Sequence, residues 1–324
     1  MSKMLKAAIV QAPPVPLAIT HGLAALAEHI SDALDVGARM VAFGETFLGG
    51  YPVWLDEAPN AALWDHRGTQ SLHAIMLDQA LRPNDPRLEP IQALVDQSGA
   101  VVSVGAHERV RNSLANTQYI FRPDAPPLLH RKLVPTHGER MIWGRGDGST
   151  LEIHEAEWGK VGHLICWEHW MPLTRALMHH QGESIHVAAW PSVRDMYLLA
   201  SRHYAFEGRC FVLAAGTIQT RDEVLAGLEL AGGDADARDL LMGMPAGQIQ
   251  FGGSAIIAPD GTVISQAGSD ADLLVAELDL MDIGRGLTSL DTDGHYARPD
   301  LFELYVDRRP RAGFGDAPAG FERA

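Results

Sequence analysis

The chain is poor in cysteine and lacks long apolar runs. Cys166 and Cys210 are the only cysteines among 324 residues, too few for the disulfide framework of a small secreted domain. No run reaches the roughly 20 apolar residues that cross a bilayer. Met1–Lys6, which precedes the first expected strand, carries no secretory signal. We therefore expect a cytoplasmic protein without a membrane partner, in which a free reactive thiol is tolerated.

Positive charge is also scarce, since 26 Lys and Arg stand against 41 Asp and Glu, for a formal net charge of -15. Nucleic acids attract clustered positive charge, so we expect no nucleic-acid partner. The 15 histidines show neither the His-Glu-x-x-His spacing nor an accompanying pair of cysteines, and we expect no metal and no other cofactor. A Gly-x-Ser-x-Gly turn, which would present a serine nucleophile, is absent as well.

Short apolar segments alternate with amphipathic ones along the chain, which is typical of an α/β protein. No Pro- or Ser-rich linker divides them. We expect a single domain over residues 1–290 and a Pro-, Gly- and Arg-rich arm over residues 291–324 that serves oligomer contacts. Residues 221–247 are acidic, Gly-rich and weakly patterned, which indicates a surface excursion or a further oligomer contact. The expected strands include 7–11, 40–43, 100–106, 128–133, 161–166, 185–189, 210–215 and 273–280, and the expected helices include 171–180 and 196–207.

Cys166 ends one of these apolar strands and precedes an expected helix. In α/β sheets, ligands bind at such strand ends, and a helix N-terminus there favours an anion and can lower the pKa of a thiol. A buried structural cysteine would fit the same position. Cys210 lies inside an apolar strand, where the structural role is expected.

Two more reactive side chains lie near the carboxyl ends of expected strands. Glu45 comes just after the strand at 40–43, before a Gly-Gly-Tyr-Pro turn, and a carboxylate there could accept a proton from a thiol. Lys132 lies late in the strand at 128–133 and could stabilise developing negative charge. Glu139 follows seven residues later and could hold the lysine by an ion pair. Taken singly, such residues are more often a solvated loop glutamate and a structural salt bridge.

The segments around these residues form a recognisable series. They are Gly44-Glu45-Thr46-Phe47-Leu48-Gly49-Gly50-Tyr51-Pro52, Arg131-Lys132-Leu133 with Pro135-Thr136, Glu139-Arg140, Gly146-Asp147-Gly148, Cys166-Trp167-Glu168, Ala189-Trp190-Pro191, Gly252-Gly253-Ser254-Ala255, and Gly294-His295-Tyr296-Ala297-Arg298-Pro299-Asp300. In this order they resemble the nitrilase superfamily of carbon–nitrogen hydrolases over nearly the whole chain. The resemblance implies a four-layer α-β-β-α sandwich.

The resemblance also implies the roles of the site residues. Glu45 would be the general base, Lys132 the stabiliser of charge, Cys166 the nucleophile and Glu139 a supporting carboxylate. The backbone N–H of Trp167 would join Lys132 in stabilising the substrate heteroatom. We expect aromatic side chains near the site to line an apolar pocket or to pack in the core, with Tyr51 and Trp190 as substrate-binding candidates beside Phe47, Trp54, Trp143 and Trp167.

Trp167-Glu168 directly after the cysteine resembles true nitrilases, which convert a nitrile to the carboxylic acid and ammonia through a covalent thioimidate and acyl-thioester. An amidase or N-carbamoyl hydrolase with the same triad, and an enzyme that hydrolyses cyanide, stay as alternatives. A catalytically silent oligomeric binding protein is the alternative outside enzymes. Gly44 and Thr46 depart from the Pro and Ala that many nitrilases carry. By resemblance we expect a homodimer through the helices at 171–180 and 196–207, or a larger homo-oligomer that extends into a spiral.

Overall fold

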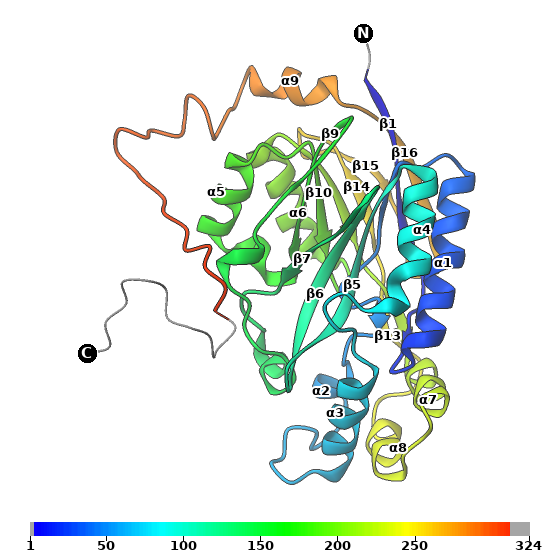
Figure 1. Ribbon diagram of the computed structural model, residues 1–324. Coiled ribbons are helices and arrows are strands. Elements are labelled where there is room, and N and C mark those ends of the chain that lie inside the picture. Colours follow the sequence, from blue (N-terminus) through cyan, green and yellow to red (C-terminus); the bar gives the residue numbers. More distant parts are fainter. Residues whose placement is uncertain (1–2, 312–324) are drawn as a thin grey trace.

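Two β-sheets packed face to face form the centre of the molecule, which a computed structural model describes from residue 3 to residue 311 (Figure 1). The first sheet has the order β16 (Asp272–Asp279), β1 (Met4–Gln11), β3 (Met40–Ala42), β5 (Val101–Val110), β4 (Leu48–Gly49) and β2 (Val15–Pro16), and β6 (Ser113–Arg122) and β7 (Ala125–Arg131) extend from β5. The second has the order β15 (Val263–Gln266), β14 (Ala255–Ile257), β11 (Phe211–Ala215), β10 (Ile185–Ala189), β9 (Gly159–Ile165) and β8 (His154–Ala156).

Side chains alternate between the two faces of each sheet, as the period of a strand requires. In β10, Ile185 and Val187 join the core between the sheets, where they meet Ile9 of β1 and Met40 of β3. Ala188 of the same strand belongs to the outer core instead. Both faces of this central strand are therefore buried, which is why its sequence is mainly apolar.

Helices cover the outer face of each sheet (Figure 1). On the first sheet lie α1 (Ile19–Asp35) and α4 (Glu89–Ser98), and α1 buries Leu23, Leu26 and Ile30 on one face. On the second lie α5 (Pro172–His180) and α6 (Asp195–Gly208). The four-layer α-β-β-α sandwich expected from the resemblance is confirmed.

The strands that carry the candidate residues run in the same direction. β3 pairs in parallel with β1 and β5, and β10 pairs in parallel with β9 and β11. β7 follows β5 through two antiparallel pairings, so it again points the same way as β5. The Glu45 N–H, just after β3, donates to the Trp190 carbonyl, just after β10, at 3.1 Å, so the carboxyl ends of strands from both sheets meet at one end of the sandwich. In α/β proteins, ligands bind at such strand ends.

A helical lobe lies below this end of the sandwich (Figure 1). It contains α2 (Trp54–Glu57), α3 (Arg67–Gln79), α7 (Arg221–Leu230), α8 (Ala235–Met242) and the strand pair β12 (Ile218–Thr220) and β13 (Gln248–Phe251). Residues 221–247 are therefore more than a surface excursion, because they contribute buried Leu228 and Leu241 to a core shared with Leu72 of α3. α7 and α8 each have only two or three buried apolar residues, which explains the weak pattern of residues 221–247 in the sequence.

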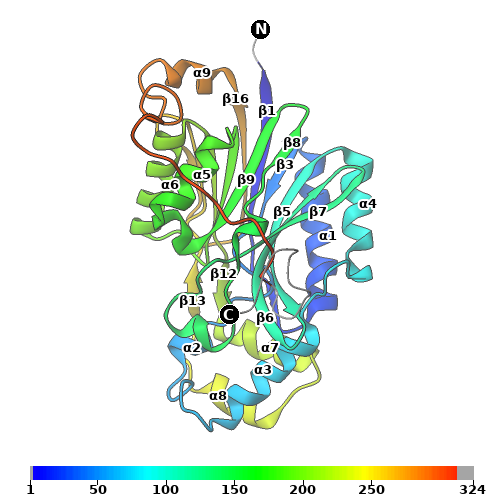
Figure 2. The same cartoon turned by 60° about the vertical axis from the view of Figure 1, so that its left-hand side comes forward.

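The C-terminal segment follows α9 (Met281–Leu287) and contains no helix or strand from 288 to 311. Figure 2 shows it passing α5 on its way back toward β7. Arg308 Nη1 donates to the carbonyl of Leu151 at 2.9 Å, and the Arg311 N–H donates to Asp147 at 2.6 Å. Residues 312–324 of the predicted arm lie outside the described residues, and its oligomer role stays a prediction. Within residues 3–311, none of the helices is long and apolar enough to cross a membrane.

Candidate active site

Glu45, Lys132, Glu139 and Cys166 meet at the shared end of the strands, and all four are at most 3 % exposed. Lys132 Nζ lies 2.8 Å from Glu45 Oε1 and 2.9 and 2.8 Å from the two oxygens of Glu139. Cys166 Sγ and one oxygen of each glutamate lie within 4.8 Å of one another. The structure thus brings together all the side chains for which the sequence predicted a catalytic role.

Chain geometry explains this convergence. Glu45 follows β3 by three residues, Lys132 directly follows β7, and Cys166 directly follows β9 in a 3₁₀ turn (Cys166–Trp170). Glu139 lies in a second 3₁₀ turn (His137–Met141), where it closes a capping box with Thr136. Two further short 3₁₀ turns, Pro86–Leu88 and Gly148–Thr150, lie elsewhere on the surface of the sandwich.

The two carboxylates differ in how many hydrogen bonds they already accept. Glu139 Oε1 accepts from Lys132 and from the Tyr51 hydroxyl at 2.7 Å, and Oε2 accepts from Lys132 and from the Thr136 N–H at 2.7 Å. Glu45 Oε1 accepts from Lys132 and from Asn116 Nδ2 at 2.6 Å, while its buried Oε2 has no partner among the described residues. Only Glu45 therefore has an oxygen free to take a proton.

Cys166 adopts a left-handed backbone conformation with φ of +54°, which a residue with a β-carbon seldom adopts. This turn places its thiol beside both glutamates, and the backbone N–H of Trp167 acts to lower the pKa of the thiol. Strain of this kind concentrates at functional sites. Burial and the neighbouring charge of Glu45 raise the pKa of the Cys166 thiol, while Lys132 opposes the rise.

Burial also governs the pKa of the base. It raises the pKa of Glu45 to about 7, with Lys132 opposing and Glu139 reinforcing the rise. For Lys132, burial acts to lower the pKa, but the charges of Cys166, Glu45 and Glu139 outweigh it and raise the pKa above its ordinary value. The lysine therefore stays an ammonium, and the thiol and Glu45 titrate as an interacting pair.

Glu168 joins the two halves of the site, a role that the sequence reading did not assign. Its carboxylate accepts from the Leu133 N–H at 2.6 Å, the Ile165 N–H at 2.7 Å and His130 Nε2 at 2.8 Å. Leu133 is the neighbour of Lys132, and Ile165 is the neighbour of Cys166. The buried carboxylate therefore fixes the backbone beside the ammonium relative to the backbone beside the thiol.

Asn116 is a second residue that the sequence reading missed. It lies in β6 beside Thr117 and Gln118, and these three buried polar residues interrupt an otherwise mainly apolar strand. Such a triplet is a detectable signal, because buried polar side chains need partners. Here the partner is Glu45.

Glycines allow the close approach of backbone segments around Glu45. A β-carbon at Gly44 would lie 2.8 Å from Thr217 Cγ2 and 3.0 Å from the Trp190 carbonyl, and one at Gly105 would lie 2.3 Å from the Thr46 backbone nitrogen. Trp190 O in turn accepts from the Glu45 N–H at 3.1 Å. The departure at Gly44 therefore fits this chain's own packing.

The aromatic candidates divide between site and core. The Tyr51 hydroxyl reaches Glu139, and its ring meets Trp143 edge to face with centroids 5.8 Å apart. The ring of Trp190 is fully buried, stacks on Tyr197 with centroids 4.7 Å apart, and donates from Nε1 to Ser201. It therefore supports the site from the core, and its carbonyl rather than its ring faces Glu45. The buried rings of Phe47, Trp54 and Trp143 also belong to the core, whereas Trp167 is 45 % exposed.

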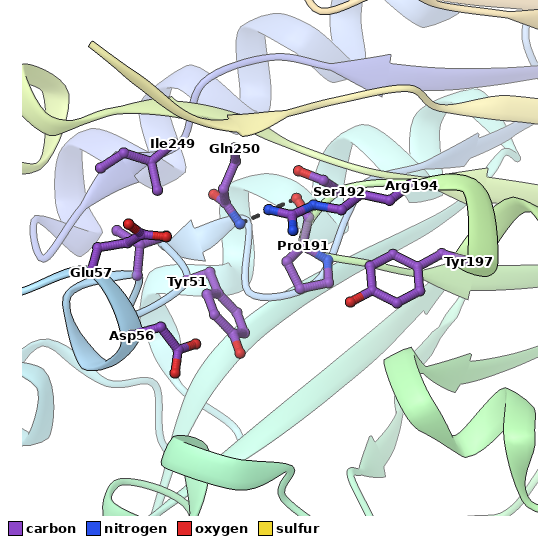
Figure 3. Close-up of a pocket in the computed structure, with 10 residues that line it drawn as sticks. Tyr51, Asp56, Glu57, Pro191, Ser192, Arg194, Tyr197, Ile249 and Gln250 are labelled. Atoms are coloured by element: carbon purple, nitrogen blue, oxygen red, sulfur yellow. Dashed lines mark hydrogen bonds between the residues drawn. The ribbon is translucent and has the colours of Figure 1, made fainter. Parts of the chain in front are cut away.

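A cavity of about 230 Å³ opens beside the site (Figure 3). Tyr51 on one wall connects it to Glu139, and Tyr197 on another meets Trp167 edge to face. The remaining walls are mainly polar rather than apolar. They comprise Val53, Asp56, Glu57, Pro191, Ser192, Arg194, Ile249 and Gln250.

Glu45, Glu139 and Cys166 also present the donor atoms of a metal site. Lys132 Nζ already lies within 2.9 Å of both carboxylates. A cation placed among these donors would face a buried ammonium, so the arrangement suits a thiol and base better than a metal.

A family model for carbon-nitrogen hydrolase matches residues 6–286. The chain is 38% identical over 309 residues to a nitrilase of Bradyrhizobium diazoefficiens, covering 94% of this chain and 93% of the relative. It is 35% identical over 310 residues to an aliphatic nitrilase of Sinorhizobium fredii, covering 95% and 97%. The crystal structure of Saccharomyces cerevisiae Nit3, a member of branch 10 of the nitrilase superfamily, aligns with a TM-score of 0.66 at 16% identity, covering 90% of this chain and 96% of that one.

Proposed function

We infer that this chain, which belongs to the carbon–nitrogen hydrolase family and within it to the nitrilases, hydrolyses an organic nitrile to the carboxylic acid and ammonia. One observation carries the inference for this chain's own residues. A buried thiol, a carboxylate with a free oxygen and an ammonium lie together, and the hydrogen bond from Tyr51 to Glu139 connects this group to the wall of a cavity. These are a nucleophile, a base and a charge stabiliser.

The reaction starts when Glu45 Oε2 takes the proton of the Cys166 thiol and the sulfur adds to the nitrile carbon. The C≡N bond becomes C=N, and the proton passes to the nitrogen, which gives a thioimidate bound to the enzyme. Lys132 and the Trp167 N–H stabilise the negative charge that develops on nitrogen. Loss of one such donor typically costs about 2.7–4 kcal/mol of barrier.

Glu45 then acts as the general base for the two water additions. A first water adds to the thioimidate carbon, both of its protons pass to the nitrogen, the nitrogen leaves as ammonia, and an acyl-thioester remains. A second water adds to the thioester, the carboxylic acid leaves, and the proton returns to the sulfur. One nitrile and two waters give one acid and one ammonia, and no redox partner is needed.

The test is a panel of nitriles with the matching amides, in which ammonia release is followed for wild type, Cys166→Ala and Cys166→Ser. We expect wild type to release ammonia from a nitrile, Cys166→Ala to be inactive and Cys166→Ser to be nearly so. Intact-mass measurement during turnover of a slow nitrile should show an adduct on Cys166. Full hydrolysis by Cys166→Ala, or ammonia from the amide alone, would contradict the proposal.

We further propose that the protein assembles as a homodimer or larger homo-oligomer through α5 and α6. Leu173 of α5 is 69 % exposed, and Met196, Leu199 and Phe206 of α6 are 56, 51 and 46 % exposed. Apolar side chains gathered on adjoining helices favour a protein partner. Mass measurement in solution, with Leu199→Glu as the disrupting variant, tests this. A reducing cytoplasm, which keeps Cys166 a thiol, is the compartment that we propose.

A further inference from the structure

A row of buried polar side chains lies between the second sheet and the helices α5 and α6, behind the nucleophile. His169 Nδ1 lies 2.7 Å from the Cys166 carbonyl oxygen, and its Nε2 lies 3.0 Å from His186 Nε2. His186 Nδ1 lies 2.7 Å from Glu183 Oε1. His169, His186 and Glu183 are 1, 0 and 5 % exposed. The mechanism described above uses none of these three side chains.

The order of atoms fixes the direction in which each hydrogen bond runs. A carbonyl oxygen can only accept, so His169 must donate from Nδ1. A neutral His169 then offers Nε2 as an acceptor, and His186 must donate to it from its own Nε2. A neutral His186 is thus left with Nδ1 as an acceptor, and Glu183 must supply the last donor. A carboxyl group donates only when it is protonated.

Burial favours the neutral form of every member of this row. It lowers the pKa of His169 to about 3 and that of His186 well below its ordinary value. It raises the pKa of Glu183 to about 7, with the Tyr204 hydroxyl and His179 opposing the rise. Among the groups that face Glu183, Tyr204 donates to its Oε2 at 2.5 Å. A protonated Glu183 can accept that bond and still donate to His186.

The peptide at the end of the row is the one that carries a stabilising donor. The Cys166 carbonyl and the Trp167 N–H belong to one rigid planar unit and point in opposite directions. A donor that holds the carbonyl from behind therefore aims the N–H toward the sulfur and the substrate. Hydrogen bonds in a chain also polarise one another, which makes that N–H a better donor.

We propose that Glu183, as a protonated carboxylic acid, and His186 and His169 are positioning residues that orient the Cys166–Trp167 peptide for stabilisation of the substrate nitrogen. This proposal rests on the nitrilase reaction proposed above, because it assigns these residues a part in that reaction. The proton on Glu183 sets the direction of the first hydrogen bond, and His186 and His169 continue that direction to the Cys166 carbonyl.

The test compares a substitution that keeps the donor with one that removes it. In Glu183→Gln, the amide N–H can donate to His186 and the amide oxygen can accept from Tyr204, whereas Glu183→Leu offers neither. We expect Glu183→Leu to lower kcat on the order of tenfold or more, short of the roughly 10²–10³-fold loss of a whole oxyanion donor, with KM within about twofold of wild type. Glu183→Gln should recover most of that loss.

A second pair of variants, His169→Asn and His169→Leu, tests the proposal independently if Glu183→Leu does not fold. In His169→Asn the amide N–H can take the place of Nδ1 of the histidine, so this variant should keep more kcat than His169→Leu. Tyr204→Phe is the matched control, because it removes a buried hydrogen bond to Glu183 Oε2 and keeps the ring, while the hydrogen bonds from Glu183 through His186 and His169 to the Cys166 carbonyl stay in place. It should lower the melting temperature and leave kcat near that of wild type.

The proton on Glu183 is tested separately by infrared spectroscopy. The wild-type spectrum at neutral pH should contain the C=O stretch of a buried protonated carboxyl that is missing in Glu183→Gln. Equal loss of kcat in folded Glu183→Gln and Glu183→Leu, wild-type kcat in Glu183→Leu, or absence of that infrared difference would overturn the proposal. If wild type releases no ammonia from any nitrile, the proposed function fails by itself, and the infrared difference still decides the protonation of Glu183.

Discussion

Replacement of Glu168 by glutamine tests whether the backbone on both sides of the site must be fixed for catalysis. The carboxylate takes the Leu133 N–H on Oε1, and it takes the Ile165 N–H and His130 Nε2 on Oε2. An amide has one acceptor oxygen. If that oxygen takes the place of Oε2, the amide NH₂ faces the Leu133 N–H, and two donors oppose each other.

The energetic loss is that of one hydrogen bond to a charged group together with one unsatisfied buried N–H. Such a bond contributes about 1.5–3 kcal/mol and an unsatisfied donor costs about 1–3 kcal/mol, so Glu168→Gln should lose roughly 2.5–6 kcal/mol of unfolding free energy. Because the bond that breaks is beside Lys132, kcat should also fall. Displacement of catalytic groups by about 1 Å can cost on the order of 10²-fold.

The stability loss should depend on pH in a defined direction. Burial acts to raise the pKa of Glu168, but His130 and the N–H groups of Leu133 and Ile165 outweigh it and hold the pKa below the ordinary 4.5. A group whose folded pKa is lowered stabilises the protein above its unfolded pKa and loses this contribution as pH falls through the folded pKa. The difference between wild type and Glu168→Gln should therefore be full above pH 4.5 and shrink below it.

Denaturant unfolding and steady-state ammonia release measure both effects, and Asp85→Asn is the matched control. Asp85 is a buried carboxylate that accepts from the Arg82 N–H at 3.0 Å, the Arg87 N–H at 3.1 Å and the Arg87 guanidinium. None of these partners belongs to the site. Asp85→Asn should lose stability and keep kcat. If Glu168→Gln lowers kcat no further than Asp85→Asn does at a similar loss of stability, Glu168 only stabilises the fold and the reasoning is refuted.

Three further outcomes follow from the site. Glu45→Gln should abolish turnover while Glu139→Gln keeps a measurable rate, because only Glu45 has a free oxygen; ammonia release separates them, and equal loss would contradict this division. In wild type, kcat/KM should rise with pH through about 7 as Glu45 becomes able to accept a proton, which a pH–rate profile checks. Arg194→Ala should raise KM more than it lowers kcat, since Arg194 lines the cavity and has no ion pair within residues 3–311; an unchanged KM across a nitrile panel would exclude a role in binding.

The layers of the fold were predictable because strand ends and amphipathic faces are local properties. Leu23, Leu26 and Ile30 mark the buried face of α1, and the apolar runs of β9, β10 and β11 mark strands buried on both sides. The convergence of Glu45, Lys132 and Cys166 needed an additional step, the resemblance to a family. Periodicity alone does not say which strand ends are neighbours.

What the sequence did not predict depends on long-range contacts. The polar walls of the cavity come from the α2 segment, the turn before α6 and β13, which are far apart in the sequence. Trp190 was a reasonable candidate for the pocket, but stacking on Tyr197 places its ring in the core. Glu168 looked like a marker of family branch, and its role became visible only when its three partners were in view.

The division of work between the two glutamates is likewise a property of the assembled site. Glu45 and Glu139 are the same residue type, both buried and both bound to Lys132. Every oxygen of Glu139 already accepts two hydrogen bonds, so a proton placed on it would displace a donor and leave that donor unsatisfied. Glu45 can take a proton on Oε2 without breaking any hydrogen bond. Tyr51 and Thr136 donate hydrogen bonds to Glu139, so that carboxylate has no free acceptor site. Glu45 is therefore the carboxylate that can exchange protons with the thiol.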